Sequence, residues 1–305
     1  MASYVMGVDF GSTTGKAVIL DLEGRIQASS VSSKGSVSDE GVRIAIAAAL
    51  AQAHIGMHDI ARTVSTGYGR RMLEVADASY TEITCHARGA VAMVPEARLV
   101  IDIGGQDSKV IAVDGNGLVA QFAMNDRCAA GTGKFLETLA RAVQVPLEEM
   151  GPMALAAREV LTISSMCATF AETEVISLLA EGHGKAEVLG AVHAAIASRT
   201  VGLVARVGQR TPVVMTGGVA QNVAAVAHIE KALGAKLIIP EHPQTAGAFG
   251  AALIALDELS SASDPRDFDP KNEVPAGPVS CTASRKARVQ SEEYLLKRPS
   301  RSCIQ

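Results

Sequence analysis

Residues 5–24 read VMGVDFGSTTGKAVILDLEG, and residues 98–117 read RLVIDIGGQDSKVIAVDGNG. The second stretch repeats the first at an offset of 93 positions, so that Asp9 corresponds to Asp102 and Lys16 to Lys109. Further matched pairs are Gly11 with Gly104, Asp21 with Asp114, and Gly24 with Gly117. Each copy is an apolar run ending in Asp, a turn of small residues, a second apolar run and a turn rich in Asp and Gly, a pattern typical of a β-hairpin.

Composition sets broad limits on the class of protein. The 305 residues predict about two domains, and 48% hydrophobic residues are ample for a core. A net charge of −4 without a basic stripe argues against a nucleic-acid partner. The first ten residues lack the features of a signal peptide, and we find no apolar run near the roughly 18 residues of a membrane span, so a cytoplasmic location is expected. Five cysteines in such a chain predict thiols or metal ligands rather than disulfides.

Strands, turns and helices alternate in the pattern, which predicts an α/β fold class. Helices are expected over residues 38–55, 83–94, 130–144, 168–181, 186–207 and 245–259, and strands at the start of 212–222 and over 236–240. The apolar face of the helix at 130–144 is expected to contain Phe135, Leu136, Leu139 and Val143. After about residue 260 the chain is rich in Ser, Pro and charge, which predicts a flexible tail or an arm that orders on a partner.

The first small-residue turn, in DFGSTTGK (9–16), has the groups that bind phosphate. It lacks the spacing of a Walker loop, and a strand rather than a helix follows it, which argues against a dinucleotide-binding fingerprint. A hairpin turn can still donate backbone N–H groups and the hydroxyls of Ser12, Thr13 and Thr14 to phosphate oxygens. One such turn alone is more often an ordinary hairpin.

A third motif, VVMTGGVAQN (213–222), favours a nucleotide site over two ordinary hairpins. Its buried strand ends in Gly217-Gly218, which offers a surface without side chains to a planar ring. Asp9 and Asp102, at strand ends across a cleft, suit Mg²⁺, which keeps most of its waters and uses few carboxylates. Over about residues 4–257 the three motifs together resemble the actin-like ATPase superfamily, which includes sugar kinases, acetate kinase and heat-shock chaperones.

This resemblance implies two ribonuclease-H-like α/β lobes with a nucleotide cleft between them. Lobe I would span 1–95, with the closing helix 245–259 packed on it, lobe II would span 96–244, and 260–305 would be the tail. Asp9 and Asp102 would be catalytic through Mg²⁺, and Gln106 would orient the attacking water, although binding a phosphate or closing the turn is an equal alternative. The other nucleotide-binding candidates are Gly11, Ser12, Thr13, Thr14, Lys16, Gly104, Gly105, Asp107, Gly217, Gly218, Gln221 and Gln244.

Two cysteines distinguish this chain from kinases and chaperones. Cys128 in NDRCAAGTGKF and Cys167 in SSMCATFAETE each precede a predicted helix, whose N-terminus favours a thiolate. Two thiolates do not complete a [4Fe–4S] site, but two copies of the pair from two subunits do. The alternative is that both are small buried residues. Cys85 is expected to be a buried helix residue, and Cys281 and Cys303 lie in the tail; none of these three is assigned a ligand role.

The segments GGQDSK, NDRCAAGTGKF, CATFAETEVISLLAEG, ASRTVGL, TGGVAQN and PEHPQTAGAFGAAL resemble the family that joins 2-hydroxyacyl-CoA dehydratase activators to the ATPase subunits of benzoyl-CoA reductase. The resemblance implies one ATP and Mg²⁺ site per subunit and a [4Fe–4S] cluster that bridges two related subunits through Cys128 and Cys167. It also implies electron transfer from ferredoxin or flavodoxin to catalytic acyl-CoA reductase or dehydratase subunits, driven by ATP hydrolysis.

Within this family the sequence favours the benzoyl-CoA reductase subunit over the homodimeric activator. About 45 residues follow the closing helix, whereas activators usually end soon after it, and the chain is rich in Arg and Ala. A sugar-kinase-like phosphotransferase is a third interpretation, with Asp107 as the candidate base, although residues suited to bind a sugar are sparse. A chaperone-like binding protein is a fourth, although we find no substrate-binding domain after residue 260.

Overall fold

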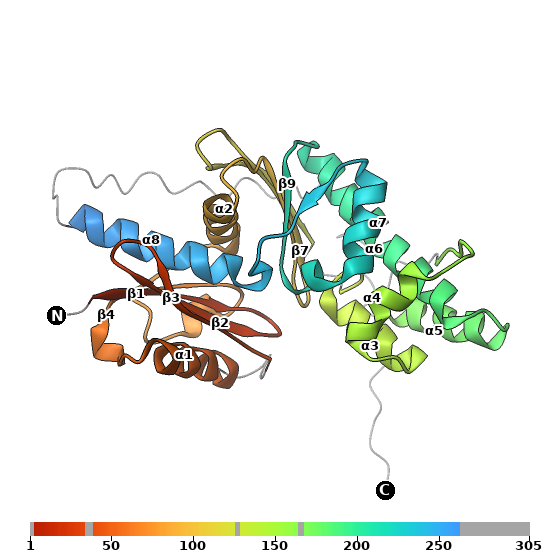
Figure 1. Cartoon of the computed structure of the whole chain (residues 1–305), viewed down its shortest axis with the longest axis horizontal. Coiled ribbons are helices and arrows are strands. Elements are labelled where there is room, and N and C mark those ends of the chain that lie inside the picture. The colour runs from red at the N-terminus through yellow and green to blue at the C-terminus, as the bar shows by residue number, and fades with distance from the viewer. Residues whose placement is uncertain (1–2, 34–38, 126–128, 164–167, 263–305) are drawn as a thin grey trace, which may run out of the picture. The chain divides into compact units, whose positions relative to one another are not determined.

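The computed structural model describes residues 3–33, 39–125, 129–163 and 168–262. Within these ranges lie two mixed five-stranded sheets with the same strand order, β3-β2-β1-β4-β5 and β8-β7-β6-β9-β10 (Figure 1). The first contains β1 (Tyr4–Phe10), β2 (Gly15–Asp21), β3 (Ile26–Ser32), β4 (Ile60–Thr66) and β5 (Ala78–Ser79). The second contains β6 (Leu99–Ile103), β7 (Ser108–Val113), β8 (Val119–Asn125), β9 (Val213–Thr216) and β10 (Leu237–Ile238). The predicted α/β class is confirmed.

The sequence repeat is a structural repeat down to single hydrogen bonds. Both predicted hairpins form, and each Asp pairs across the strands with its Lys, Asp9 with Lys16 and Asp102 with Lys109. The turns match as well, since the amides of Gly11 and Gly104 each donate to the carbonyl three residues later. At the far end of each hairpin a glycine, Gly24 or Gly117, has a φ near +80°, which a residue with a side chain rarely adopts.

Helices cover both faces of the first sheet (Figure 1). α1 (Glu40–Ala53) packs against the face that presents Met6 and Val8, and α8 (Ala246–Ala262) packs against the face that presents Val5. Because successive strand residues point to opposite faces, β1 is buried on both sides. Gly7 allows α8 to lie close to the sheet, since a Cβ there would overlap the backbone of Ala248.

α2 (Glu82–Met93) connects the two halves of the fold. Its apolar residues, including Ile83 and Ala87, pack on the second sheet, although the helix follows the last strand of the first. It crosses α8 at very short range, because a Cβ at Gly89 would overlap the carbonyl of Ala246 and one at Gly250 that of Cys85. This crossing fixes the N-terminal end of α2 beside the second hairpin.

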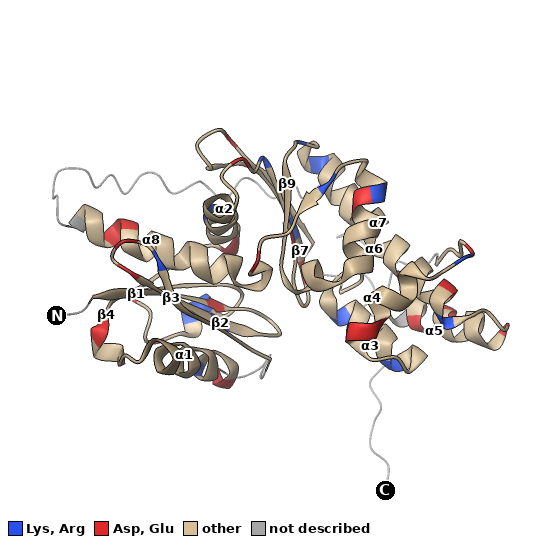
Figure 2. Cartoon of the chain, viewed as in Figure 1, with Lys and Arg blue, Asp and Glu red and all other residues tan. Residues whose placement is uncertain are grey.

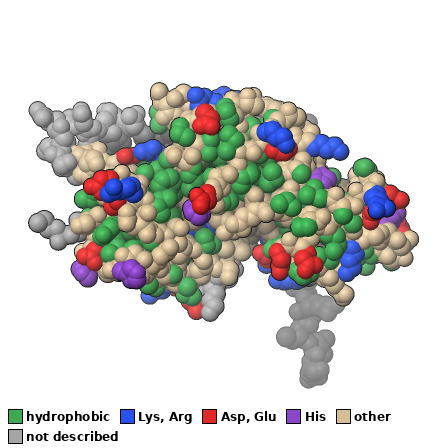
Figure 3. Space-filling model, viewed as in Figure 1, with side chains coloured by type: hydrophobic (Ala, Val, Ile, Leu, Met, Phe, Trp, Pro, Cys, Tyr) green, Lys and Arg blue, Asp and Glu red, His purple; other side chains and the backbone are tan. Residues whose placement is uncertain are grey.

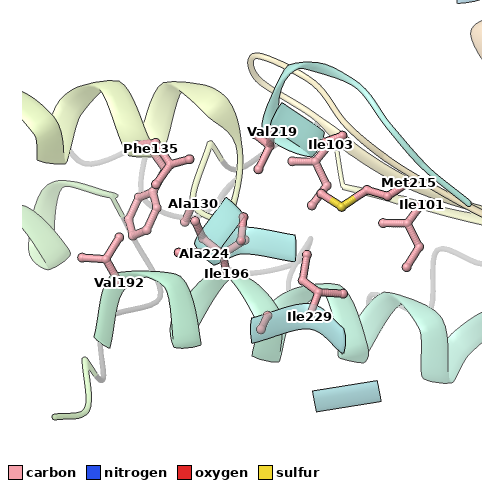
Figure 4. Packing of buried hydrophobic residues seen from close by; sticks show 14 of the residues in the cluster. Ile101, Ile103, Ala130, Phe135, Val192, Ile196, Met215, Val219, Ala224 and Ile229 are labelled. Atoms are coloured by element: carbon pink, nitrogen blue, oxygen red, sulfur yellow. The ribbon is translucent and has the colours of Figure 1, made fainter. Parts of the chain in front are cut away.

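Most of the helices pack on the face of the second sheet opposite to α2. This layer contains α3 (Gly133–Val143), α4 (Leu147–Leu155), α5 (Ala168–Ala180), α6 (Lys185–Val207) and α7 (Val223–Leu233). Phe135 of α3, Ile196 of α6 and Ile229 of α7 belong to one buried cluster with Ile101 of the sheet (Figure 4). The face predicted for α3 is confirmed, since its four apolar residues are all buried. The helix begins at Gly133, three residues later than predicted, because residues 129–132 form a loop and turn.

α6 is long and apolar enough to be mistaken for a membrane span, but 56% of its most apolar window is buried inside the protein. We therefore interpret α6 as a core helix. Acidic and basic residues are interspersed over the described elements (Figure 2), also on the face shown in Figure 3.

Candidate functional site

A cavity of about 1110 Å³ lies between the two hairpin turns and the Gly217-Gly218 turn. Every residue that the sequence predicted for nucleotide binding or catalysis lines it. These residues are Asp9, Gly11, Ser12, Thr13, Thr14, Lys16, Asp102, Gly104, Gly105, Gln106, Asp107, Gly217, Gly218, Gln221 and Gln244. The volume is at the upper end of the range for small-molecule and cofactor sites. Three segments far apart in the sequence thus meet around one space.

The first hairpin contributes a simple ion pair to the cavity. Lys16 Nζ lies 3.0 Å from Asp9 Oδ2, and Asp9 is 4% exposed. The turn beyond them touches the second hairpin, because Thr13 Oγ1 occupies the space where Gly105 would carry a Cβ. This hydroxyl is buried and has no hydrogen-bond partner among the described residues. A buried hydroxyl without a partner beside two glycine turns fits a site that receives phosphate oxygens.

The second hairpin contributes a buried network instead of a single pair. Lys109 Nζ lies 3.2 Å from Asp102 Oδ2 and 3.2 Å from Glu82 Oε2, and it also contacts the Asp107 carboxylate. Asp102 Oδ1 accepts a hydrogen bond of 2.8 Å from the hydroxyl of Thr216. Both side chains of the central pair are 2% exposed, so the network is shielded from water.

These contacts shift the pKa values in opposite directions. Burial alone would raise the pKa of Asp102, but the charges of His86 and Lys109 outweigh it and hold that pKa well below its usual range. Burial alone would lower the pKa of Lys109, but the three surrounding carboxylates raise it above its usual range. The pKa of Glu82 is raised, chiefly because of burial. The nearby charge of Lys109 lowers this pKa but offsets the effect of burial only in part.

The Gly217-Gly218 turn requires glycine for two separate reasons. Gly217 has a φ of +87°, and a Cβ there would overlap the carbonyl of Ile103 at the end of β6. Its amide donates a hydrogen bond of 2.9 Å to the carbonyl of Pro243, which holds the neighbouring Gln244 against Gly218. Asn222 then caps α7, its side chain accepting from the amides of Ala224 and Ala225. The flat surface predicted for a planar ring is therefore rigidly held.

The second turn is also bonded directly to α3. The amide of Gly133 donates to the carbonyl of Gly104 at 2.9 Å, and the amide of Lys134 donates to the carbonyl of Gly105 at 2.7 Å. These are the first two amides of α3, which have no partner inside the helix. Gln106 sits between the bonded glycines and Asp107, and it is exposed to the cavity.

Several cavity residues were not predicted from the sequence. Glu82 and His86 lie one helical turn apart on α2, and His86 Nδ1 is 3.2 Å from Asp102 Oδ1. Their i, i+4 spacing in EITCHARG places both on one face of a helix, but nothing in the sequence indicates which sheet that face meets. Tyr68 and Arg70 also line the cavity, from the loop after β4. The turn STGYGR in the sequence is the signal that could have identified them.

The cysteines divide into those the structure describes and those it does not. Cys128 and Cys167 lie outside the described residues, as do Cys281 and Cys303. Cys85 is buried in α2 as predicted, with a free thiol. Burial raises the pKa of this thiol to about 12, so it is protonated at neutral pH.

Comparison with known proteins agrees with this site. The chain is 45% identical over 254 residues to the activator of lactoyl-CoA dehydratase from Anaerotignum propionicum, covering 83% of this chain and 98% of that protein. It superposes with a TM-score of 0.82 and 40% identity on the activator of the 2-hydroxyisocaproyl-CoA dehydratase from Clostridium difficile with bound ADPNP, covering 87% and 99%. A benzoyl-CoA reductase component from Thauera aromatica is 34% identical over 210 residues, covering 67% and 74%.

The predicted fold, two α/β lobes of the actin-like type, is confirmed by the paired sheets and by this superposition. The related activator structure contains the bound nucleotide analogue ADPNP, and the residues of this chain that were predicted to bind a nucleotide line one cavity. The family profile matches residues 6–255. The chain belongs to the BadF/BadG/BcrA/BcrD ATPase family.

Proposed function

We propose that this protein is the ATP-hydrolysing activator of a 2-hydroxyacyl-CoA dehydratase. Two copies share one [4Fe–4S] cluster through Cys128 and Cys167. Reduced ferredoxin or flavodoxin supplies one electron, the cluster carries it, and hydrolysis of ATP to ADP and phosphate drives its delivery to the dehydratase. The expected location is the cytoplasm.

The observation that carries this proposal is the pair of hydrogen bonds between α3 and the second phosphate turn. α3 begins five residues after Cys128 in the sequence, and its first two amides are bonded to Gly104 and Gly105. A movement of that turn on nucleotide binding therefore has to move the start of α3 or break both bonds. This gives a short physical route from the nucleotide to the segment that contains one proposed cluster ligand.

The cavity residues suit Mg²⁺ and ATP. Asp9 has one lysine partner, and we expect it to hold the metal or one of its waters. Asp102 already has a partner on each oxygen, so we expect it to act through metal-bound water. Gln106 is the candidate for orienting the attacking water. The lobes proposed to close around the nucleotide are 1–95, with the closing helix 245–259, and 96–244, with 260–305 as a tail.

The comparisons favour the activator over the benzoyl-CoA reductase subunit that the sequence predicts. Identity to the lactoyl-CoA dehydratase activator is 45% across 98% of that protein, against 34% across 74% of the Thauera aromatica reductase component. The arguments for the reductase were the tail after residue 260, which lies outside both the family match and the described residues, and composition, which reflects no specific chemistry. A sugar kinase is disfavoured because its candidate base, Asp107, is ion-paired with Lys109.

A partner subunit is supported by α5, the helix that follows Cys167. Ala171 and Val175 of this helix are buried in the core. Phe170 and Ile176, on the same helix, are 69% and 52% exposed. Large apolar side chains exposed on the helix that follows a proposed cluster ligand in the sequence are what a homologous subunit would cover.

Anaerobic purification with iron analysis and electron paramagnetic resonance of the reduced protein tests the cluster. The variants Cys128→Ala and Cys167→Ala should lose iron and dimerise poorly while still binding ADP. Cys85→Ala is the matched control, because this cysteine is buried in α2, and it should keep its iron. Full iron content in either ligand variant would refute the assignment.

A second assay distinguishes the activator from the reductase. The purified protein, ATP and a low-potential reductant should start turnover of a separately purified 2-hydroxyacyl-CoA dehydratase, measured as loss of the 2-hydroxyacyl-CoA. The activator is expected to purify as a homodimer. Co-purification with larger catalytic subunits and a second, different ATPase subunit would favour the reductase instead.

A further inference from the structure

Arg70 differs from the two lysines that line the cavity in its ion pairing. Three basic Lys or Arg side chains line it, and two of them, Lys16 and Lys109, are ion-paired with carboxylates. Among the described residues, Arg70 has no carboxylate within ion-pair distance. The lining also contains six carboxylates: Asp9, Glu82, Asp102, Asp107, Glu137 and Glu148. An acidic cavity that receives a polyphosphate needs positive charge, and Arg70 is the lining Arg or Lys that no carboxylate has already neutralised.

The backbone around Arg70 is fixed against the first hairpin. The amide of Gly69 donates to the carbonyl of Phe10 at 2.9 Å, and a Cβ at Gly69 would overlap the Phe10 ring. Gly67 has a φ of +88° and lies against the Asp9 carboxylate, with no room for a side chain. The guanidinium of Arg70 donates to the Gly67 carbonyl at 3.1 Å. The loop is therefore held against the first hairpin, with Gly67 beside the Asp9 carboxylate and Arg70 lining the same cavity.

One donor of the guanidinium is engaged in that hydrogen bond, and a guanidinium has five. The carbonyl of Arg70 in turn accepts from the hydroxyl of Ser65 at 2.8 Å, so the residue is anchored at both its backbone and its side chain. A guanidinium that is held in place and keeps N–H donors without a partner among the described residues matches the geometry of phosphate oxygens.

We propose that Arg70 is a catalytic residue that binds the terminal phosphate of ATP and stabilises the charge that develops there during hydrolysis. The proposal rests on the proposed ATPase function. In the reaction, a water oxygen forms a bond to the γ-phosphorus, the bond to the oxygen bridging the β- and γ-phosphates breaks, and ADP, phosphate and a proton are released. Arg70 keeps its own proton throughout and contributes hydrogen bonds and charge.

Three variants test the role. Arg70→Ala removes the charge, Arg70→Lys keeps the charge without the planar fork, and Arg71→Ala is the matched control, because Arg71 is exposed and does not line the cavity. We expect Arg70→Ala to lower kcat for ATP hydrolysis roughly 100-fold or more with a much smaller change in KM. Arg70→Lys should recover part of the loss, and Arg71→Ala should match the wild type.

Equilibrium binding separates a catalytic role from a structural one. Because ADP lacks the terminal phosphate, Arg70→Ala should weaken binding of ADPNP about tenfold while leaving ADP binding and the thermal unfolding midpoint nearly unchanged. Equal loss of ADP and ADPNP binding, or a kcat within about threefold of the wild type, would overturn the assignment. A wild-type protein that neither binds nor hydrolyses ATP would instead overturn the proposed function.

Discussion

Lys109→Met is expected to destabilise the protein far more than Lys16→Met, although the two lysines are equivalent in the sequence repeat. Lys109 Nζ contacts three carboxylates, of Asp102, Asp107 and Glu82, and its side chain is 2% exposed. Lys16 pairs only with Asp9, and its side chain is 15% exposed. Methionine has a similar length and no charge, so each variant removes mainly the ammonium group.

The magnitude follows from what each variant leaves behind. At 3.2 Å and an effective dielectric constant near 20, one charge pair is worth about 5 kcal/mol, before the opposing loss of hydration. Removing one member of a buried pair costs about 3–5 kcal/mol, because the other charge is left uncompensated. Lys109→Met removes the ammonium group from three carboxylates, of which Asp102 still has His86 at 3.2 Å, so we expect a loss within this range. For the more exposed Lys16 pair we expect about 1–2 kcal/mol.

Urea unfolding followed by circular dichroism measures both free energies, because the chain has no Trp for fluorescence. In the wild type, the lowered pKa of Asp102 means that its contribution is present above the unfolded pKa near 3.9 and is lost as the pH falls through the folded value. The raised pKa of Lys109 means that its contribution is present below about pH 10.4 and is lost at higher pH. Between about pH 5 and 9 the contribution of the Asp102–Lys109 pair is therefore constant in the wild type.

In Lys109→Met the crowded carboxylates take up protons more readily, so its deficit should shrink as the pH falls from 7 to 5. Total stabilities of about 5–15 kcal/mol are typical, so a loss of this size removes a large share of the stability at pH 7. The double variant Lys109→Met with Glu82→Gln removes one uncompensated charge and should be more stable than Lys109→Met alone. Equal losses for the two lysine variants, or no rescue by Glu82→Gln, would refute the reasoning.

Further predictions concern three buried positions. Gly217→Ala should lower the thermal midpoint and weaken ADP binding, because φ is +87° and the added methyl would overlap the Ile103 carbonyl; calorimetry measures both effects. Burial lowers the pKa of His193 to about 4 from 6.5, so the contribution of this residue to stability should be constant above pH 6.5 and should fall by about 3 kcal/mol as the pH drops toward 4. His193→Leu should flatten this dependence in urea unfolding, and an unchanged slope would assign it to other groups. Cys85, with a pKa raised to about 12, should resist iodoacetamide until urea unfolds the protein, as peptide mass spectrometry would show.

Much of the fold could be predicted because it repeats. The match between Asp9 and Asp102, and between Lys16 and Lys109, predicted two hairpins, and the structure pairs these residues in the same register. Helix α4 was missed because Pro152 lies inside it, and proline normally ends a helical pattern. The start of α3 was misplaced because glycine and small residues continue the local pattern without fixing a cap.

The cavity could be predicted only where its residues lie in a local motif. The hairpin and Gly217-Gly218 residues are recognisable from their turns. Glu82 and His86 are not, because their role depends on α2 packing on the second sheet rather than on the first, which precedes it. Arg70 is not recognisable from the sequence for a related reason. Its importance lies in having no carboxylate partner among the described residues, whereas Lys16 and Lys109, the two lysines that line the cavity, each have one.

The two hairpins share a sequence pattern but differ in how fully their polar groups are paired, and this difference indicates how a nucleotide would act. In the second hairpin, Asp102 and Lys109 are fully engaged and the turn is bonded to α3, so a ligand gains little there by rearrangement. Two groups with bonding capacity to spare, the Thr13 hydroxyl and the Arg70 guanidinium, come from loops that follow strands of the first sheet. A ligand shifts a conformational equilibrium only as far as its contacts differ between the two states. We therefore infer that the nucleotide draws the first and second hairpin turns together, and that the second turn carries the bonded start of α3 with it. Variants of Thr13 and Arg70 should then alter the drive for closure, and variants of Gly104 and Gly105 should alter its transmission to α3.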